Sequence, residues 1–154
     1  MSTNSYQELL SLRCVNNSQP IDARDFLGKL VVVLSFRPTE MLSEIYIQKF
    51  KEWAEHYKEH MVLVFVFSPS YEAENKLELL NACIHRYDIN SPVFFDEKKD
   101  FDHIHGFKEK AGVLVYDQLG RRRFLGSGML DLKKTHELCL PVSYTHLTLP
   151  TKQP

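Results

Sequence analysis

Cysteine is scarce in this sequence, which has only three in 154 residues, at Cys14, Cys83 and Cys139. Such a small, odd number excludes a disulfide scaffold and leaves at least one thiol unpaired. An excess of one charge is also lacking, because 19 Lys and Arg stand against 20 Asp and Glu, for a formal net charge of −1. A nearly neutral chain has no general electrostatic attraction to nucleic acid or to a membrane, so neither is expected as a partner.

Long hydrophobic runs are absent as well. No stretch approaches the ~20 apolar residues that span a bilayer. The start of the chain, Met1 to Tyr6, lacks the basic and apolar regions of a signal peptide. The length suits one domain with a core of its own. We therefore expect a soluble, single-domain, cytoplasmic protein.

The last residues are unlike the rest of the chain. Val142 to Thr151 (VSYTHLTLPT) resembles one reading frame of a transposon-derived sequencing adapter, and the alternative is a genuine polar tail. We therefore expect an N-terminal extension (1–17), a domain (18–141) and an artefactual tail (142–154). On the adapter interpretation, the natural chain continues beyond Leu140.

Buried strands are the clearest structural signal. Leu30 to Leu34, Met61 to Phe67 and Val93 to Phe95 are unbroken apolar runs, typical of parallel strands covered on both faces. Before them, Tyr6 to Leu12 favours a short helix and Cys14-Val15 a short extended piece.

Helical periodicity separates these strands. After the first one, Pro38-Thr39-Glu40 predicts a helix start with Thr39 as the N-cap. The apolar stripe of this helix consists of Leu42, Ile45, Tyr46, Phe50, Trp53 and Tyr57. The helix after the second strand has its apolar positions at Ala73, Leu77, Leu80, Ile84 and Tyr87.

The end of the domain predicts a β-hairpin and one more helix. Residues 111–116 and 122–125 flank the turn sequence Asp117-Gln118-Leu119-Gly120, and a helix is expected from Asp131. The order β-α-β-α-β, hairpin, helix predicts an α/β fold with a mixed central sheet and helices on both faces.

Several motifs together resemble a known family. They are Gly28-Lys29 before the first strand, Arg86-Tyr87-Asp88-Ile89 at a helix end, Pro92-Val93 with Asp96, and Val113 to Asp117 followed by Gly120-Arg121. Their order resembles the thioredoxin-like superfamily. The chain is similar to its redoxin branch (thiol–disulfide oxidoreductases of the cytochrome-maturation type and peroxiredoxins) and to the thioredoxin-like domain preceding NHL repeats in larger proteins. The resemblance covers roughly Ser18 to Leu140 and implies a thioredoxin-like fold.

The resemblance also implies where redox chemistry would occur. In this family a Cys-x-x-Cys begins the helix after the first buried strand, where helix-end N–H groups stabilise a thiolate. The matching positions here are Glu40 and Ser43. The family's cis-Pro lies six residues before the acidic residue of the hairpin turn, which is Ala111 in this chain. Dithiol chemistry at these positions is therefore not expected.

Other reactive residue types have simpler interpretations. Cys83 is the alternative thiol, but its place beside an apolar stripe favours a buried structural role. Asp100, Asp102, His103 and His105 form a D-x-D-H-x-H cluster, in which the two His would share a face of an extended segment and could bind a metal. A solvated loop or helix start is the simpler interpretation, so no metal and no cofactor are expected.

Two further motifs near the hairpin have structural interpretations. Arg121-Arg122-Arg123 indicates solvation and protection of a sheet edge. Gly126-Ser127-Gly128 does not match a phosphate-binding loop and predicts the turn into the last helix.

Two functional hypotheses follow. The first is a redox-inactive thioredoxin-like domain that binds a protein or peptide, or that serves as an accessory domain of a longer protein. Its contact face would be the one that normally holds substrate backbone, at Arg37, Pro38, Thr39, Lys110, Ala111 and Gly112. The second is an enzyme, a redoxin-type thiol peroxidase or reductase that uses a displaced cysteine such as Cys83.

Overall fold

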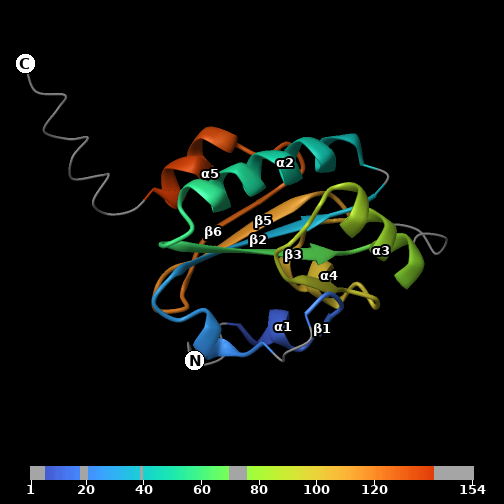
Figure 1. Ribbon diagram of the computed structural model, residues 1–154, viewed down its shortest axis with the longest axis horizontal. Helices are drawn as coiled ribbons and strands as arrows, with labels where there is room; N and C mark the ends of the chain where they lie inside the picture. Colours follow the sequence, from blue (N-terminus) through green and yellow to red (C-terminus); the bar gives the residue numbers. More distant parts are fainter. Residues whose placement is uncertain (1–5, 18–20, 39, 70–75, 141–154) are drawn as a thin grey trace, which may run out of the picture.

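A six-stranded sheet is the centre of the structure, a computed structural model (Figure 1). The residues that it describes are 6–17, 21–38, 40–69 and 76–140. The predicted tail (142–154), the expected N-cap Thr39 and the predicted helical residue Ala73 lie outside them.

The sheet is mixed, as the sequence predicted. Its strands are β1 (Arg13–Cys14), β2 (Leu30–Phe36), β3 (Met61–Phe67), β4 (Val93–Phe95), β5 (Gly112–Tyr116) and β6 (Arg122–Ser127). Their order across the sheet is β1-β4-β3-β2-β5-β6. The central strands β2, β3 and β4 are parallel, whereas β1, β5 and β6 run antiparallel to their neighbours.

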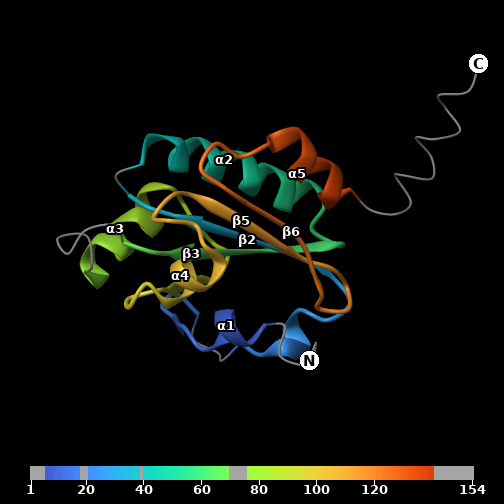
Figure 2. The same ribbon diagram turned by 180° about the vertical axis from the view of Figure 1, so that it is seen from behind.

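Helices cover both faces of the sheet, which confirms the predicted architecture. They are α1 (Gln7–Leu10), the 3-10 turn η2 (Ala23–Asp25), α2 (Met41–His56), α3 (Leu77–Arg86), α4 (Asp100–His105) and α5 (Leu132–Cys139). Helices α2 and α5 lie side by side on one face, and α1 and α4 lie on the other (Figures 1 and 2). None of the helices in the described part of the chain is long and apolar enough to cross a membrane.

The alternation of side chains along the strands divides the core into two clusters. Val32 and Leu34 of β2 pack with α2, α3 and α5, whereas Val31 and Val33 pack with α1 and α4. One position of the predicted α2 stripe is wrong, because Ile45 is 52% exposed while Ile47 is fully buried. The buried face of α2 is therefore rotated away from Ile45.

Two segments have a more definite form than the sequence predicted. The D-x-D-H-x-H segment, expected as a loop or a helix start, is a short helix, α4, which ends at Gly106 in a left-handed conformation (φ 68°). Its His103 is exposed and its His105 buried, so the two rings do not share a face. Gly126 and Ser127 continue strand β6 and are not part of the turn into the last helix.

Candidate functional site

The candidate site lies where the end of β2 meets the start of β5. These strands are antiparallel neighbours, with Ser35 opposite Gly112, so the chain leaving β2 and the chain entering β5 come together. The first leads into α2 through residues 37–40, and the second is the segment 107–111. The positions that match the family's redox pair and its cis-Pro thus meet at one end of the sheet.

Glu40 and Ala111 contact each other directly. Glu40 is the N-cap residue of α2, yet its side chain makes no hydrogen bond to its own helix. Its Oε1 instead accepts a hydrogen bond from the backbone N–H of Ala111, at 2.9 Å. The described residues contain no cis peptide bond, so Ala111 is trans. A proline at position 111 would lack the N–H that makes this contact.

Ser43 lies one turn into the same helix and is buried. Its hydroxyl oxygen accepts a hydrogen bond from the backbone N–H of Arg37, at 3.2 Å. The position that matches the second redox cysteine therefore fixes the segment between β2 and α2. Both Glu40 and Ser43 are engaged inside the protein.

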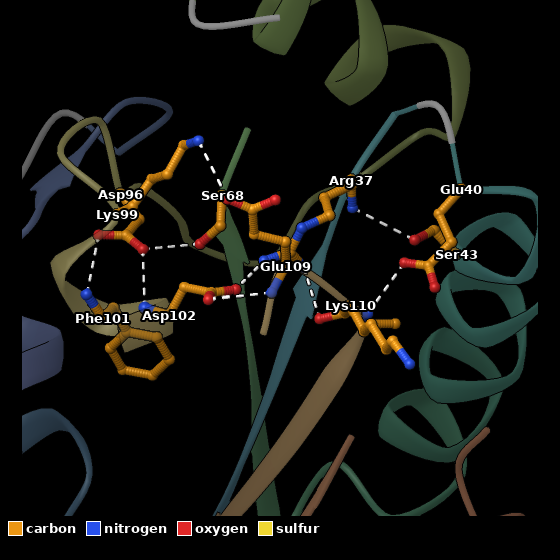
Figure 3. A network of polar contacts seen from close by, with 11 residues as sticks. Arg37, Glu40, Ser43, Ser68, Asp96, Lys99, Phe101, Asp102, Glu109 and Lys110 are labelled. Atoms are coloured by element: carbon orange, nitrogen blue, oxygen red, sulfur yellow. Dashed lines mark hydrogen bonds and ion pairs between the residues drawn. The ribbon is translucent and has the colours of Figure 1, made fainter. Parts of the chain in front are cut away.

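Arg37 does not reach the surface, contrary to its place on the expected contact face. Its side chain is 1% exposed and forms an ion pair with Asp102 of α4. Its guanidinium also donates to the backbone carbonyl of Lys110 (Figure 3). Arg37 thus joins α4, the segment before β5 and, through its own N–H, the start of α2.

Two buried carboxylates hold α4 and the neighbouring turn. Asp96 accepts hydrogen bonds from the N–H groups of Phe101 (3.0 Å) and Asp102 (2.9 Å) and from the Ser68 hydroxyl (2.7 Å). Burial of Asp96 penalises its charged form and raises the pKa of this carboxyl group. Asp102 in turn accepts from the N–H of Glu109, at 3.1 Å (Figure 3).

The turn before β5 has an unusual backbone. Lys110 N–H donates to the Phe107 carbonyl (3.1 Å), and the central residues Lys108 and Glu109 both have positive φ, 57° and 61°. This combination is typical of a type I′ turn, which normally contains Asn and Gly. Each non-glycine residue in this conformation costs about 1 kcal/mol. The buried Asp102 and Arg37 hold the turn through Glu109 and Lys110.

Few of the expected contact residues are open to solvent. Pro38 is half-buried and Lys110 is exposed, whereas Ala111 is buried. Gly112 lies under the Phe107 ring, where an added Cβ would come within 2.5 Å of ring atoms. The sixth residue, Thr39, lies outside the described residues.

Met129 was missed by sequence reasoning. It is 81% exposed and directly follows Gly128, whose N–H donates to the Ala111 carbonyl at 2.8 Å. No clear signal in the sequence marks it, because Met129 precedes another apolar residue, Leu130, which is buried.

The three cysteines lie away from the start of α2. Cys14 is on the edge strand β1, with its sulfur 3.7 Å from Asn16 Oδ1. Cys83 in α3 is 6% exposed, in agreement with the buried position that its helix predicted. Cys139 ends α5, where burial raises the pKa of its thiol to about 12. The structure contains no disulfide between them.

His105 of α4, like Asp96, has a pKa that differs from its ordinary value. Its Nδ1 lies 3.3 Å from a guanidinium nitrogen of Arg122, and its Nε2 lies 3.7 Å from a carboxylate oxygen of Glu8. Burial, together with the charge of Arg122, lowers the pKa of His105 to about 4. The described residues contain no group of three His, Cys, Asp or Glu placed to bind a metal.

The arrangement of these elements defines the thioredoxin-like fold. In solved structures the same fold occurs in a thioredoxin-like protein in its oxidised form (TM-score 0.70, 18% identity, covering 82% of this chain and 86% of that one). It also occurs in a thiol-disulfide isomerase from Corynebacterium glutamicum (TM-score 0.67, 17% identity, 82% and 88% covered). A third is a secreted disulfide oxidoreductase from Mycobacterium tuberculosis (TM-score 0.65, 10% identity, 86% and 97% covered).

These likenesses confirm the thioredoxin-like fold that the sequence motifs predicted, and at such low identity they concern the fold alone. No protein-family model matches the sequence, and no curated protein matches it.

Proposed function

We infer that this chain is a redox-inactive thioredoxin-like domain that binds a protein or peptide, on its own or as the accessory domain of a longer protein. The observation that carries this proposal is the Glu40–Ala111 hydrogen bond. It occupies the place where the family's nucleophilic cysteine and cis-Pro would face each other. Neither residue can form or exchange a disulfide.

The surroundings of Glu40 support the same proposal. The helix N-terminus and a nearby guanidinium are features that would stabilise a thiolate. Here the helix start carries a carboxylate, and the Arg37 guanidinium is engaged with Asp102. Cys83 is buried, which weighs against the alternative of a peroxidase or reductase with a displaced cysteine.

The proposed contact face consists of Pro38, Lys110 and Met129, three residues that are not buried in the segments around Ala111. Met129 offers an apolar contact and Lys110 a positive charge beside it, because Lys110 Cδ lies 3.6 Å from the position of a Cβ on Gly128. A bound peptide would place an apolar side chain against Met129 and a negative charge near Lys110.

Two measurements test the proposal. In the insulin-reduction and peroxide-consumption assays, the whole chain should have no activity above a Cys83→Ser variant. In an NMR titration, the S-carbamidomethylated insulin B chain, an extended peptide with blocked cysteines, should shift the amide signals of residues 110–112 and 128–129. Lys110→Glu with Met129→Asp should abolish these shifts, whereas Lys133→Glu on α5 should not. Catalysis lost on Cys83→Ser, or shifts elsewhere on the protein, would contradict the proposal.

A further inference from the structure

Strand β6 forms an open edge of the sheet. It is the last strand in the order β1-β4-β3-β2-β5-β6, and β5 is the one strand that pairs with it in the described part of the chain (Figure 2). The edge strand of a sheet presents main-chain groups to which a further strand can bind. The outer side of β6 is therefore a place where another chain can pair with this sheet.

The register of β6 identifies which main-chain groups point outward. Hydrogen-bonded and non-hydrogen-bonded pairs alternate along an antiparallel ladder. Gly128 N–H donates to the Ala111 carbonyl (2.8 Å), and Leu125, three positions before Gly128, stands opposite Leu114. Leu125, and likewise Ser127, therefore belongs to a non-hydrogen-bonded pair, and its N–H and carbonyl are directed away from β5. Within the described residues no group accepts a hydrogen bond from either N–H.

The side chains along this edge carry positive charge. Residues 121–123 are three exposed arginines, and β6 contains no acidic residue. Lys134 of α5 lies over the ring of Phe124, with its Nζ 5.1 Å from the ring centroid. The Asp117 carboxylate offsets only part of this charge, because it is shared between the first and the last of the arginines, at 3.1 and 3.9 Å from their Nε atoms.

We propose that β6 binds an acidic, extended segment of a partner protein, which adds to the sheet as a further strand. Carbonyls of the segment accept from the N–H groups of Leu125 and Ser127, and its own N–H groups donate to the outward carbonyls of β6. An apolar side chain of the segment covers Leu125, which is 42% exposed, and its carboxylates face the arginines. This surface goes beyond the proposed contact face, because it consists of other residues.

Charge distinguishes this partner from a second copy of the chain. Pairing of β6 with itself would bring two sets of arginines and two Lys134 side chains to one edge, where like charges destabilise the pairing. An acidic segment neutralises the same charges. The arginines that the sequence predicted to protect a sheet edge thus act against self-pairing and leave the edge open to an acidic strand.

Hydrogen exchange on the whole chain, measured by NMR, tests the pairing. The probe is an end-blocked peptide of alternating valine and glutamate, long enough to cover β6, and the corresponding valine–lysine peptide is the charge-reversed control. The acidic peptide should slow the exchange of the Leu125 and Ser127 amides. The Phe124 and Gly126 amides, which are directed toward β5, should change little. Tripolyphosphate, an anion without a peptide backbone, should leave the exchange of Leu125 unchanged.

Variants separate the contribution of the backbone from that of charge. Leu125→Pro removes the outward N–H without breaking a bond to β5 and should weaken binding about tenfold, whereas Leu125→Thr keeps the N–H and should bind more tightly than the proline variant. Arg123→Gln with Lys134→Gln should weaken binding about fivefold. Arg86→Gln with Lys98→Gln is the matched control, because it removes the same charge from exposed residues near β4, on the other side of the sheet.

Each outcome bears on the proposal directly. Slower exchange of Leu125 and Ser127 with the acidic peptide, weakened by the Arg123 and Lys134 substitutions, would support it. Unchanged exchange of Leu125 at a saturating peptide concentration, or equal binding of the valine–lysine peptide, would overturn it. Protection of the Leu125 amide that rises with protein concentration in the absence of peptide would overturn it in favour of a second copy of the chain.

Discussion

The carboxylate of Glu40 and the backbone amide of Ala111 are hydrogen-bonded although 71 positions separate them in the sequence. The contact needs a side chain with the reach of glutamate on one side and a residue with an N–H on the other. A cysteine at position 40 or a proline at position 111 would each remove it. Glu40 and Ala111, the positions that the family resemblance matches to a redox cysteine and the cis-Pro, are therefore complementary in their chemistry.

The buried ion pair between Arg37 and Asp102 yields the first prediction. Arg37→Met leaves the Asp102 carboxylate buried without its counter-charge, and this should cost about 4 kcal/mol of unfolding free energy. The double variant Arg37→Met, Asp102→Asn should recover much of the loss, because the amide oxygen still accepts from Glu109 N–H. Urea denaturation of the wild type and the variants measures both effects. A double variant as unstable as Arg37→Met would contradict this account.

The turn at Lys108 and Glu109 yields the second prediction. Glu109→Gly relieves a residue at φ 61° and should raise the unfolding free energy by about 1 kcal/mol. The lost ion pair with Lys99 is exposed and offsets little of this gain. Gln118→Gly, in an exposed turn position without positive φ, is the control and should be neutral or destabilising. Thermal melting distinguishes these outcomes, and equal effects of both glycines would argue against strain.

The third prediction concerns pH. The pKa of His105 is about 4 in the folded protein and about 6.5 in the unfolded chain. The unfolded chain therefore binds more protons between these values, so stability is complete above pH 6.5 and falls toward pH 4, by about 2 kcal/mol. His105→Asn should flatten this part of the curve, whereas His103→Asn, on the exposed side of α4, should not. Denaturation at a series of pH values gives the slopes.

Asp96 acts in the opposite direction at the acid end. Its raised pKa lets the folded protein bind a proton at higher pH than the unfolded chain does. Asp96→Asn should therefore steepen the loss of stability on acidification. If the unfolding free energy of this variant fell less steeply on acidification than that of the wild type, burial would not raise the pKa of Asp96.

Cysteine labelling provides the fourth prediction. Cys14 should react with a maleimide first, because it is the only one of the three that is not buried. Cys83 and Cys139 should label only after denaturation, because both are buried and because burial raises the pKa of the Cys139 thiol to about 12 in the folded protein. Mass spectrometry of partly labelled protein gives the order. Rapid labelling of native Cys83 would revive the enzymatic alternative.

The sequence predicted some elements of the fold with their bounds and others only in part. The runs Met61–Phe67 and Val93–Phe95 are strands with the predicted bounds. A short, unbroken apolar run between polar residues favours a buried strand, and the polar residues mark its ends. Helix α4 was missed as a complete helix, since six residues are too few to display a periodic apolar stripe. Its first turn is held by Asp96, which lies outside the helix and accepts the N–H groups of Phe101 and Asp102.

The candidate site was only partly predictable. The positions of Glu40, Ser43 and Ala111 followed from the family resemblance, but their hydrogen bonds did not. Arg37 was expected on the contact face because the family resemblance matches its segment to the surface that holds substrate backbone. Its partner Asp102 lies on another element, and no local pattern in one sequence connects two such residues.

The pairing of β2 with β5 has a consequence for the order of folding. The unit β2–α2–β3 and the hairpin β5–β6 can each form from neighbouring residues. Val31 must instead find Tyr116, and Ser35 must find Gly112, across roughly half of the chain. Such distant closure is the slow part of folding. Docking of the hairpin onto β2 is then the late step, and the face around Glu40 and Ala111 does not exist until it is complete. A folding intermediate without this docking would therefore have α2 in place and still lack the proposed contact face.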